Sequence, residues 1–235
     1  MTPCAYPRVL IITAMVEEAR AFLPEGTAGP AAFPLGSWRQ VETADVSLAG
    51  HTARLAVCGI GSVNAAACTT RLIGEYSPDL VISAGSAGGL GAEVAVGDVV
   101  VGSHYRYHSA DATAFGYALG QIPGMPERYE AAASPLAEVE GAPGTVRVGE
   151  ILSGDSFIAA HLVAEVRAAF PEALATDMES APIAQACHLA GVPFLSVRGI
   201  SDLCDASAAD SFHMAVEQVA DRSRAVITHL LAAMN

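Results

Sequence analysis

Short, almost wholly apolar runs alternate along this chain with stretches of helical pattern, and this alternation limits its fold more than any other feature. Buried strands are predicted at Val9 to Ala14, Ala53 to Cys58, Leu80 to Ala84, Asp98 to Ser103 and Phe194 to Val197. A polar, alternating pair is expected between Trp38 and Leu48. Helices are predicted at Val16 to Leu23, Val63 to Glu75, Ala159 to Phe170, Glu179 to Ala190 and Asp210 to Ala233.

Strands that are apolar along their whole length need cover on both faces. The pattern therefore predicts the α/β class, as a three-layer α/β/α sandwich around a central mixed twisted sheet. No Ser/Gly linker, repeat or charge block divides the chain, so one domain is expected over residues 1–235. Sheets of this kind carry their sites at the carboxyl ends of the strands. The Gly- and Pro-containing stretch from Ala114 to Pro126 is predicted to be a long functional loop.

The charge balance excludes several classes of partner and enzyme. Twelve basic residues against 25 acidic ones give a net charge of -13, which disfavours polymeric nucleic acid and anionic membrane surfaces as partners. All of the basic residues are Arg. A P-loop lysine, a Schiff-base lysine and a pyridoxal phosphate anchor are therefore excluded.

The cysteines and the N-terminal segment predict a cytoplasmic protein. The sequence has five widely spaced cysteines and no C-x-x-C pair, which favours neither a disulfide framework nor a zinc site. The mostly apolar run from Val9 to Met15 is too short to span a membrane and lacks a signal-peptide cleavage pattern.

Three glycine- or histidine-rich motifs admit functional interpretations that the sequence does not favour. "CGIGSVNAA" at 58–66 lacks the third glycine of a dinucleotide fingerprint, so a tight strand-to-helix turn is the better interpretation. "AGSAGG" at 84–89 would make Ser86 a hydrolase nucleophile, but further glycines follow where a helix should begin, and close approach of backbone to a ligand is favoured. "HYRYH" at 104–108, with Asp111, suggests a metal, yet residues four apart on a strand are separated by roughly 13 Å, so no metal is expected.

The most informative residues are acids set against apolar segments. Asp177-Met178-Glu179 and Ser201-Asp202 interrupt segments that look buried, and Glu18 opens the helix after the first predicted strand. Taken singly, each acid is also what a helix first turn or a cap would show. Taken alone, Phe157 would likewise be interpreted as an ordinary aromatic residue of the core.

The ordered set of motifs resembles the nucleoside phosphorylase superfamily, and most closely the 5′-methylthioadenosine/S-adenosylhomocysteine nucleosidases. The resemblance covers essentially the whole chain. It rests on "ITAMVEE" at 12–18, "CGIGSVNAA" at 58–66, "SAGSAGGL" at 83–90, "GDVVV" at 97–101, "YHSADATAFGYALGQIPG" at 107–124, "SGDSFI" at 153–158, "DMES" at 177–180 and "RGISDLCD" at 198–205. A nucleoside phosphorylase-like sandwich is the fold that this resemblance implies.

The resemblance implies hydrolysis of an N-glycosidic bond by three acids. Glu18 would polarise the attacking water, Asp202 would protonate adenine at N7, and Glu179 would hold the ribose hydroxyls. Such a reaction passes through an oxocarbenium-like state and needs a base, an acid and a group that fixes the sugar.

The same resemblance implies which residues contact the substrate. Phe157 would stack on adenine, and the backbone of Ile158 would contact the purine edge. The other expected contacts, around the sugar, the 5′-substituent and Asp202, are Met15, Ile60, Ser86, Ala87, Gly88, Met178, Ser201 and Phe212, of which Phe212 closes the apolar channel. No cofactor is implied.

In relatives, the loop that matches Phe115 and Pro123 reaches into the neighbouring subunit's pocket. The resemblance therefore implies a homodimer with composite sites.

The sequence departs from the family pattern at three positions. Ala112 stands where a larger aliphatic residue is common and lies by resemblance at the 5′-thioalkyl pocket, Pro182 falls within a helical first turn, and Asp177 replaces the usual Glu.

The sequence leaves two alternatives to hydrolysis open. Phosphorolysis is the runner-up, although related phosphorylases place an Arg where this chain has Ala84. A non-catalytic nucleoside-binding relative is the other. Methylthioadenosine, S-adenosylhomocysteine, 5′-deoxyadenosine and 6-amino-6-deoxyfutalosine are not distinguished as substrates.

Overall fold

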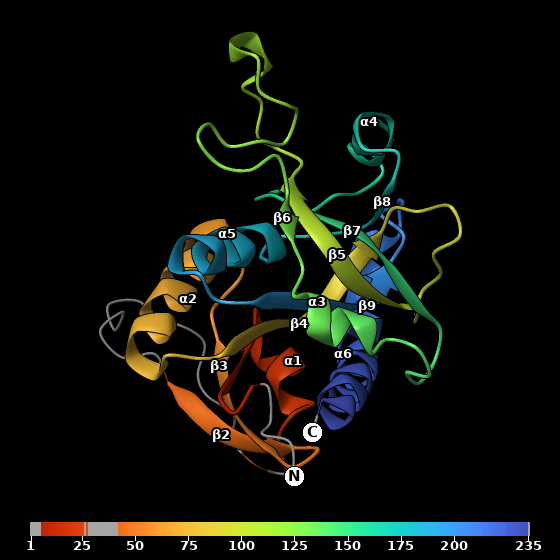
Figure 1. Ribbon diagram of the computed structural model, residues 1–235. Helices are drawn as coiled ribbons and strands as arrows, with labels where there is room; N and C mark the ends of the chain where they lie inside the picture. Colours follow the sequence, from red (N-terminus) through yellow and green to blue (C-terminus); the bar gives the residue numbers. More distant parts are fainter. Residues whose placement is uncertain (1–5, 26, 28–41, 235) are drawn as a thin grey trace.

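The computed structural model describes residues 6–25, 27 and 42–234. Its middle layer is a nine-stranded mixed sheet with helices on both sides (Figure 1). The strands are β1 (Val9–Thr13), β2 (Thr43–Leu48), β3 (His51–Val57), β4 (Leu80–Gly89), β5 (Val99–Tyr107), β6 (Tyr129–Glu130), β7 (Val146–Ser153), β8 (Ala173–Asp177) and β9 (Phe194–Asp202). The helices are α1 (Val16–Arg20), α2 (Ser62–Tyr76), α3 (Ala133–Ala137), α4 (Val163–Ala169), α5 (Ser180–Ala190) and α6 (Ala208–Ala233), with a 3-10 turn, η1, at Thr113–Phe115.

The sheet runs in the order β2-β3-β1-β4-β8-β7-β5-β6, and β9 pairs with both β4 and β5. These pairings close a ring of β4, β8, β7, β5 and β9 at one end of the sheet. Strands β3, β1, β4 and β9 run parallel to one another, so their carboxyl ends meet at one edge. That edge is where a sheet of this type places a site.

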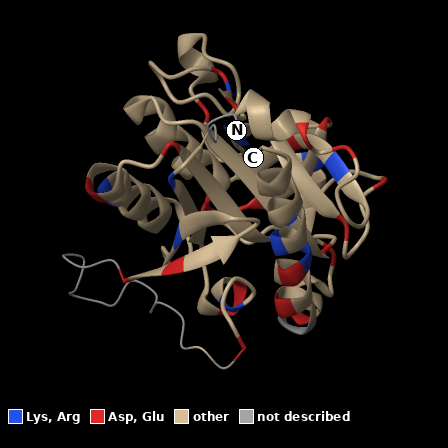
Figure 2. Ribbon diagram, turned by 60° about the horizontal axis from the view of Figure 1, so that its bottom comes forward, with Lys and Arg blue, Asp and Glu red and all other residues tan. Residues whose placement is uncertain are grey.

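Two apolar cores lie on opposite faces of the sheet, which confirms the predicted α/β/α layering. On one face, α2 and α5 pack through residues such as Leu72 and Ile183. On the other face, α1 and α6 pack through residues such as Ala19 and Ile227. In Figure 2 the charged positions gather mainly on the outer helices and loops, and most of the sheet is uncharged. Within the described part of the chain, no helix is both long and apolar enough to cross a membrane.

The structure corrects several of the predicted element boundaries. β4, β5 and β9 run past their apolar cores to Gly89, Tyr107 and Asp202, because pairing with neighbouring strands carries them into polar and glycine-rich sequence. α1 ends earlier than predicted, at Arg20, and α4 begins later, at Val163.

The sequence analysis missed β6, β7, β8 and α3 altogether. Their short runs mix polar and small residues, and long-range pairing defines the three strands. Of the predicted polar pair, the part from Thr43 is β2, and Trp38 to Val41 lie outside the described residues.

Candidate active site

A cavity of about 300 Å³ opens at the edge where the parallel strands end. It receives residues from the ends of β1, β4, β8 and β9 and from the starts of α1 and α6. Its lining residues are Ala14, Met15, Glu18, Ile60, Ser86, Ala87, Gly88, Phe157, Thr176, Asp177, Met178, Glu179, Ser201, Asp202, Ala209 and Phe212. The three acids singled out in the sequence, Glu18, Glu179 and Asp202, thus share one cavity although they are far apart in the chain.

Glu18 is held on all sides by hydrogen-bond donors. One carboxylate oxygen accepts from the backbone N–H groups of Ala14 at 3.0 Å and Met15 at 3.1 Å. The other accepts from the N–H of Ser86 at 2.9 Å and from its hydroxyl at 2.8 Å. The side chain is only 1% exposed. Two strand ends, those of β1 and β4, therefore fix this carboxylate in a single orientation.

The glycines of β4 allow this close approach. A Cβ on Gly85 would lie 2.5 Å from Glu18 Oε1 and 2.8 Å from a guanidinium nitrogen of Arg198. Its φ of +154° is also one that residues with side chains rarely adopt. A Cβ on Gly88 would lie 3.2 Å from Asp202 Oδ1. "AGSAGG" is therefore the second half of β4, where missing side chains make room for the carboxylates of Glu18 and Asp202.

Asp202 ends β9 and is 2% exposed. Its Oδ1 accepts a hydrogen bond from the N–H of Cys204 at 2.9 Å, and the hydroxyl of Ser201 lies 2.9 Å from its Oδ2. Burial raises the pKa of Asp202 above its ordinary value, although these two hydrogen bonds act in the opposite direction. The environment therefore favours the protonated form, which is the form that can act as an acid.

Glu179 caps the start of α5 and is 5% exposed. One of its oxygens accepts a hydrogen bond from the N–H of Gly61 at 2.9 Å, and the other lies 3.8 Å from the guanidinium of Arg198. Burial raises the pKa of Glu179 to about 7, and Arg198 opposes part of that rise.

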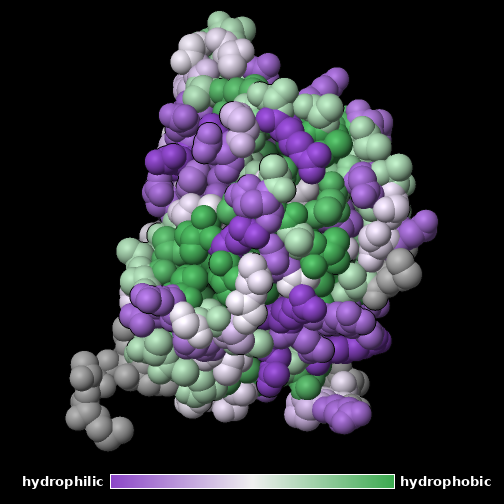
Figure 3. Space-filling model, turned by 90° about the vertical axis from the view of Figure 1, so that its right-hand side faces the viewer, coloured by the Kyte–Doolittle hydropathy of each residue, from purple (hydrophilic) through white to green (hydrophobic). Residues whose placement is uncertain are grey.

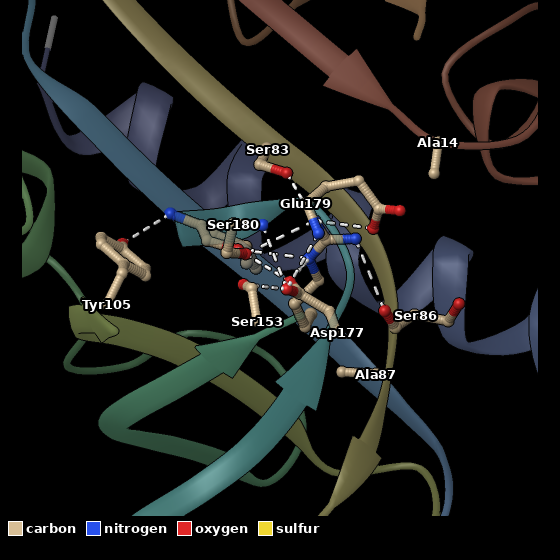
Figure 4. A network of polar contacts seen from close by, with 12 residues as sticks. Ala14, Ser83, Ser86, Ala87, Tyr105, Ser153, Asp177, Glu179 and Ser180 are labelled. Carbon is tan, nitrogen blue, oxygen red and sulfur yellow. Dashed lines mark hydrogen bonds and ion pairs between the residues drawn. The ribbon is translucent and has the colours of Figure 1, made fainter. Parts of the chain in front are cut away.

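Arg198 and Asp177 form a buried ion pair, of which Asp177 also lines the cavity. Figure 4 shows Asp177 in a polar network with Ser153 and Ser180. The pair is joined by Arg198 Nε and Asp177 Oδ2 at 2.9 Å, and the two side chains are 1% and 2% exposed. Asp177 also accepts from Ser153 Oγ at 2.6 Å and from both the N–H and the hydroxyl of Ser180. Arg198 donates to Ser83 Oγ at 2.6 Å. Buried charges of this kind are stable only when paired and hydrogen-bonded, as both are here.

Two aromatic rings form the more open side of the cavity. Phe157 and Phe212 meet edge to face with ring centroids 6.2 Å apart. Next to them a smaller hollow of about 40 Å³ is lined by Gly88, Ser156, Phe157, Ile158, Thr176, Asp177, Met178 and Asp202. A flat apolar group that entered between these walls would meet Asp202 at its edge.

Of the expected substrate contacts, Ile158 lines only the smaller hollow, and three line neither hollow among the described residues: Ala112, Phe115 and Pro123. They belong to the segment between β5 and β6, which projects from the top of the molecule in Figure 1. Phe115, at the end of η1, is 83% exposed.

The two histidines of "HYRYH" contact different residues. His104 lies 3.5 Å from the buried carboxylate of Glu150, whereas the ring of His108 packs over Gly154.

The sequence analysis missed some residues of the site. Arg198 and Asp177 were noted only as parts of motifs, and Ala14, Thr176 and Ala209 were not considered as lining residues. A signal for Arg198 existed, since it is a charged residue inside a strand that is buried along its whole length. Its partners could not be read from the sequence, because they come from other strands and from α5.

Comparisons with known proteins agree on one family. The family model of the phosphorylase superfamily matches residues 8–234. A 5′-methylthioadenosine/S-adenosylhomocysteine nucleosidase of Staphylococcus aureus (strain bovine RF122 / ET3-1) is 44% identical over 180 residues, which cover 74% of this chain and 78% of the relative.

Solved structures give the same result. The nucleosidase of that name from Neisseria meningitidis, in complex with methylthio-immucillin-A, superposes with a TM-score of 0.86 at 36% identity and covers 97% of this chain and 99% of its own. Futalosine hydrolase of Helicobacter pylori superposes with a TM-score of 0.84 at 27% identity. The match covers 96% of this chain and 97% of the hydrolase.

Proposed function

This chain belongs to the phosphorylase superfamily and, within it, to the 5′-methylthioadenosine/S-adenosylhomocysteine nucleosidases, and we propose that Glu18, Glu179 and Asp202 carry its reaction. The chain is an N-ribosyl hydrolase that releases adenine from 5′-substituted adenosines. The observation that supports the proposed roles is the convergence of three buried carboxylates, each in a different environment, on one cavity.

Glu18 is the group that activates water. The hydroxyl of Ser86 directs its proton to Glu18 and presents its lone pairs to the cavity, where they accept a hydrogen bond from a water molecule. As this water adds to C1′ of the ribose, its proton passes to Ser86 Oγ while the Ser86 hydroxyl proton passes to Glu18, so that Glu18 is the final proton acceptor. The fixed orientation of the carboxylate keeps this proton acceptor beside the attacking atom.

Asp202 is the acid for the leaving base. When the bond between C1′ and the purine breaks, its electron pair passes to the base, and the proton of Asp202 goes to N7. Protonation turns a poor leaving group into neutral adenine. Burial, which raises the pKa of Asp202, supports this role because it makes the carboxyl hold a proton more readily than an exposed aspartate does.

Glu179 binds the ribose hydroxyls through the carboxylate oxygens that face the cavity. Arg198 contacts Glu179 from outside the cavity lining and Asp177 anchors Arg198, so the buried ion pair holds Glu179 in place. Met178, which lines the cavity next to Glu179, packs against the sugar.

Purine and 5′-substituent occupy the more apolar parts of the cavity. Phe157 stacks on adenine, and the backbone of Ile158 contacts the purine edge beside Asp202. Met15, Ile60 and Phe212 line the channel toward the 5′-substituent.

The lining favours water over phosphate as the nucleophile. Among the described residues that line the cavity there is no Arg, and the nearby Arg198 is committed to Asp177 and Glu179. Phosphate needs cationic donors that are free to bind it, and Glu18 on the nucleophile side repels it.

The experiment is chromatography of the purified protein with each of the four nucleosides named above, with and without phosphate. We expect the same rate of adenine release in both buffers, together with the free 5′-substituted ribose. A ribose-1-phosphate product, or a rate that depends on phosphate, would contradict hydrolysis. Binding of these nucleosides without turnover would favour a non-catalytic role.

A second copy of the chain completes each site in our proposal. The segment that carries Phe115 and Pro123 projects from its own molecule, and Phe115 is too exposed for a side chain of its kind without a partner (Figure 1). Ile60 and Val63, beside the cavity, are 52% and 78% exposed. The face shown in Figure 3 is a less suitable interface, because a hydrophilic band divides its apolar residues into two areas. Sedimentation analysis that finds only monomers at micromolar concentration would contradict the homodimer.

The proposed cellular setting is the cytoplasm. The four cysteines in the described part of the chain are free and buried, which fits a reducing compartment. Adenine and a 5′-thioribose, the expected products, fit a salvage route for methionine sulfur.

A further inference from the structure

Arg167 of α4 links three backbone carbonyls around the base side of the cavity. Its Nε donates to the carbonyl of Leu90 at 2.9 Å. One terminal nitrogen lies 3.3 Å from the carbonyl of Gly89 and 3.3 Å from that of Leu203. A planar guanidinium suits such a set of acceptors because its five N–H groups lie in a fixed fork.

These carbonyls belong to the ends of two strands that form the site. Gly89 is the last residue of β4 and follows Gly88, which lines the cavity. Leu203 follows Asp202, the last residue of β9. Because β4 and β9 are parallel neighbours, both strand ends lie at the same edge, and Arg167 joins them from outside the cavity.

α4 also follows the segment that carries the purine contacts. Beneath this helix, Ile158, Val163, Leu90 and Cys204 pack in one small apolar cluster. This cluster joins the Phe157–Ile158 segment, the end of β4 and the turn after Asp202. Arg167, on the helix that follows the Phe157–Ile158 segment, makes polar contacts with the other two parts, the end of β4 and the turn after Asp202.

We propose that Arg167 is a positioning residue for the base subsite, which it acts on through Asp202 and the Phe157–Ile158 segment. The inference rests on the proposed function, because it takes the purine to lie between these two parts. Arg167 is not among the described residues that line the cavity. Its removal therefore changes the relative placement of the proton donor and the stacking wall without removing any substrate contact.

The test compares Arg167→Met, Arg167→Lys and the control Arg222→Met. Methionine keeps an apolar stem but no donor, whereas lysine keeps the charge and some of the hydrogen bonds without the fork. Arg222 is a matched control because it also reaches from a helix to a backbone carbonyl, that of Gly97, away from the cavity.

For Arg167→Met we expect single-turnover adenine release to slow by about 10- to 100-fold, the usual scale of small misplacements. Adenine affinity, measured by calorimetry, should fall by about tenfold, and affinity for 5-methylthioribose should change by less than about twofold, since only the base side is disturbed. The rate of adenine release and the adenine affinity of Arg167→Lys should lie between those of wild type and of Arg167→Met. Arg222→Met should match wild type in all three measurements.

A purely structural Arg167 would give another pattern. The melting temperature of Arg167→Met would fall, while folded protein, assayed well below that temperature, would keep wild-type adenine affinity and turnover. Equal losses of adenine and 5-methylthioribose affinity would also overturn the proposal. Because adenine binding is measured without turnover, a wild-type protein that binds adenine but hydrolyses no nucleoside would contradict the proposed function and still leave the Arg167 comparison valid.

Discussion

At the scale of single residues, the three carboxylates differ in their surroundings more than in their chemistry. Glu18 is surrounded by four donors, Glu179 faces Arg198, and Asp202 has two donors in a buried turn. These differences support the proposed roles, because donors and opposite charges stabilise a carboxylate whereas burial stabilises the protonated acid.

The variant Asp202→Asn tests whether Asp202 is the acid that protonates the leaving base. Asparagine keeps the shape and a hydrogen-bond donor but has no proton to deliver, so the chemical step should slow by about 10² to 10⁴. Adenine affinity should fall much less. Single-turnover adenine release and a melting curve on the same preparation check this. A well-folded variant with near wild-type turnover would remove Asp202 from the mechanism.

Glu179 makes folding stability depend on pH in a defined window. Its pKa is about 7 when folded and 4.5 for the ordinary side chain, so between these values the folded state holds a proton that the unfolded state releases. Stability from this group is therefore present below pH 4.5 and is lost as pH rises toward 7, with a slope of at most about 1.4 kcal/mol per pH unit.

Urea unfolding of the wild type and of Glu179→Gln at pH 5 and pH 7 checks this. Glutamine does not titrate, so the difference in free energy of unfolding between the two proteins should change in favour of Glu179→Gln as pH rises. An unchanged difference would show that the pKa of Glu179 is not raised.

Ala112 is predicted to set the width of the 5′-substituent channel in the neighbouring subunit. Ala112→Val should reduce turnover of S-adenosylhomocysteine more than that of methylthioadenosine, by roughly 1 to 3 kcal/mol in transition-state free energy. Steady-state rates for both substrates measure the effect. Equal effects would show that Ala112 is remote from the channel.

At the scale of elements, β4 shows how a strand is adapted to a site. Its first half is buried aliphatic sequence, and its second half, "AGSAGG", continues the same pairing with β9 while leaving space for Glu18 and Asp202. α5 shows a similar adaptation at its start. Pro182 is the third residue of this helix, where the missing N–H has no partner in the helix to lose.

Gly85→Ala should damage both stability and activity, because the new Cβ would collide with Glu18 and with Arg198. We expect a loss of roughly 1 to 3 kcal/mol in the free energy of unfolding, as for strained backbone positions. The matched control is Gly74→Ala in α2, where a Cβ would have nothing within 4 Å. That change should stabilise the protein by about 0.5 to 1 kcal/mol. Denaturant unfolding and adenine release on both variants test this, and a Gly85→Ala protein with wild-type values would contradict it.

At the scale of the whole molecule, the proposed composite site predicts complementation between inactive chains. A Glu18→Gln homodimer should be inactive, and a Phe115→Ala homodimer should be weak. In a mixed dimer, one site has Glu18 from the Phe115→Ala chain and Phe115 from the Glu18→Gln chain, so it is intact. Random remixing should then give about a quarter of wild-type activity per chain, since half of the dimers carry one good site of two. Activity that never exceeds the average of the two homodimers would show that each chain builds its site alone.

The sequence by itself determined the layered α/β architecture and the acids that form the site. Continuous apolar strands such as Val9–Thr13 demand cover on both faces, and a pattern of neighbouring residues is sufficient to detect them. An acid such as Glu18 beside such a strand could also open an ordinary helix, so its selection depended on the ordered motifs along the whole chain that resemble one family.

Only the tertiary structure decided the ring of strands, the pairing of Arg198 with Asp177 and the contacts of Arg167 with two strand ends. Each depends on contacts between segments far apart in the chain: Ser83 and Ser180 meet Arg198, and Leu203 meets Arg167. β7 and β8 have too little apolar periodicity to be recognised alone, and they become strands because β4 and β5 offer free edges to pair with. The physical reason is that a strand edge or a buried charge is satisfied by whichever partner the fold brings to it, and the sequence near it does not specify that partner.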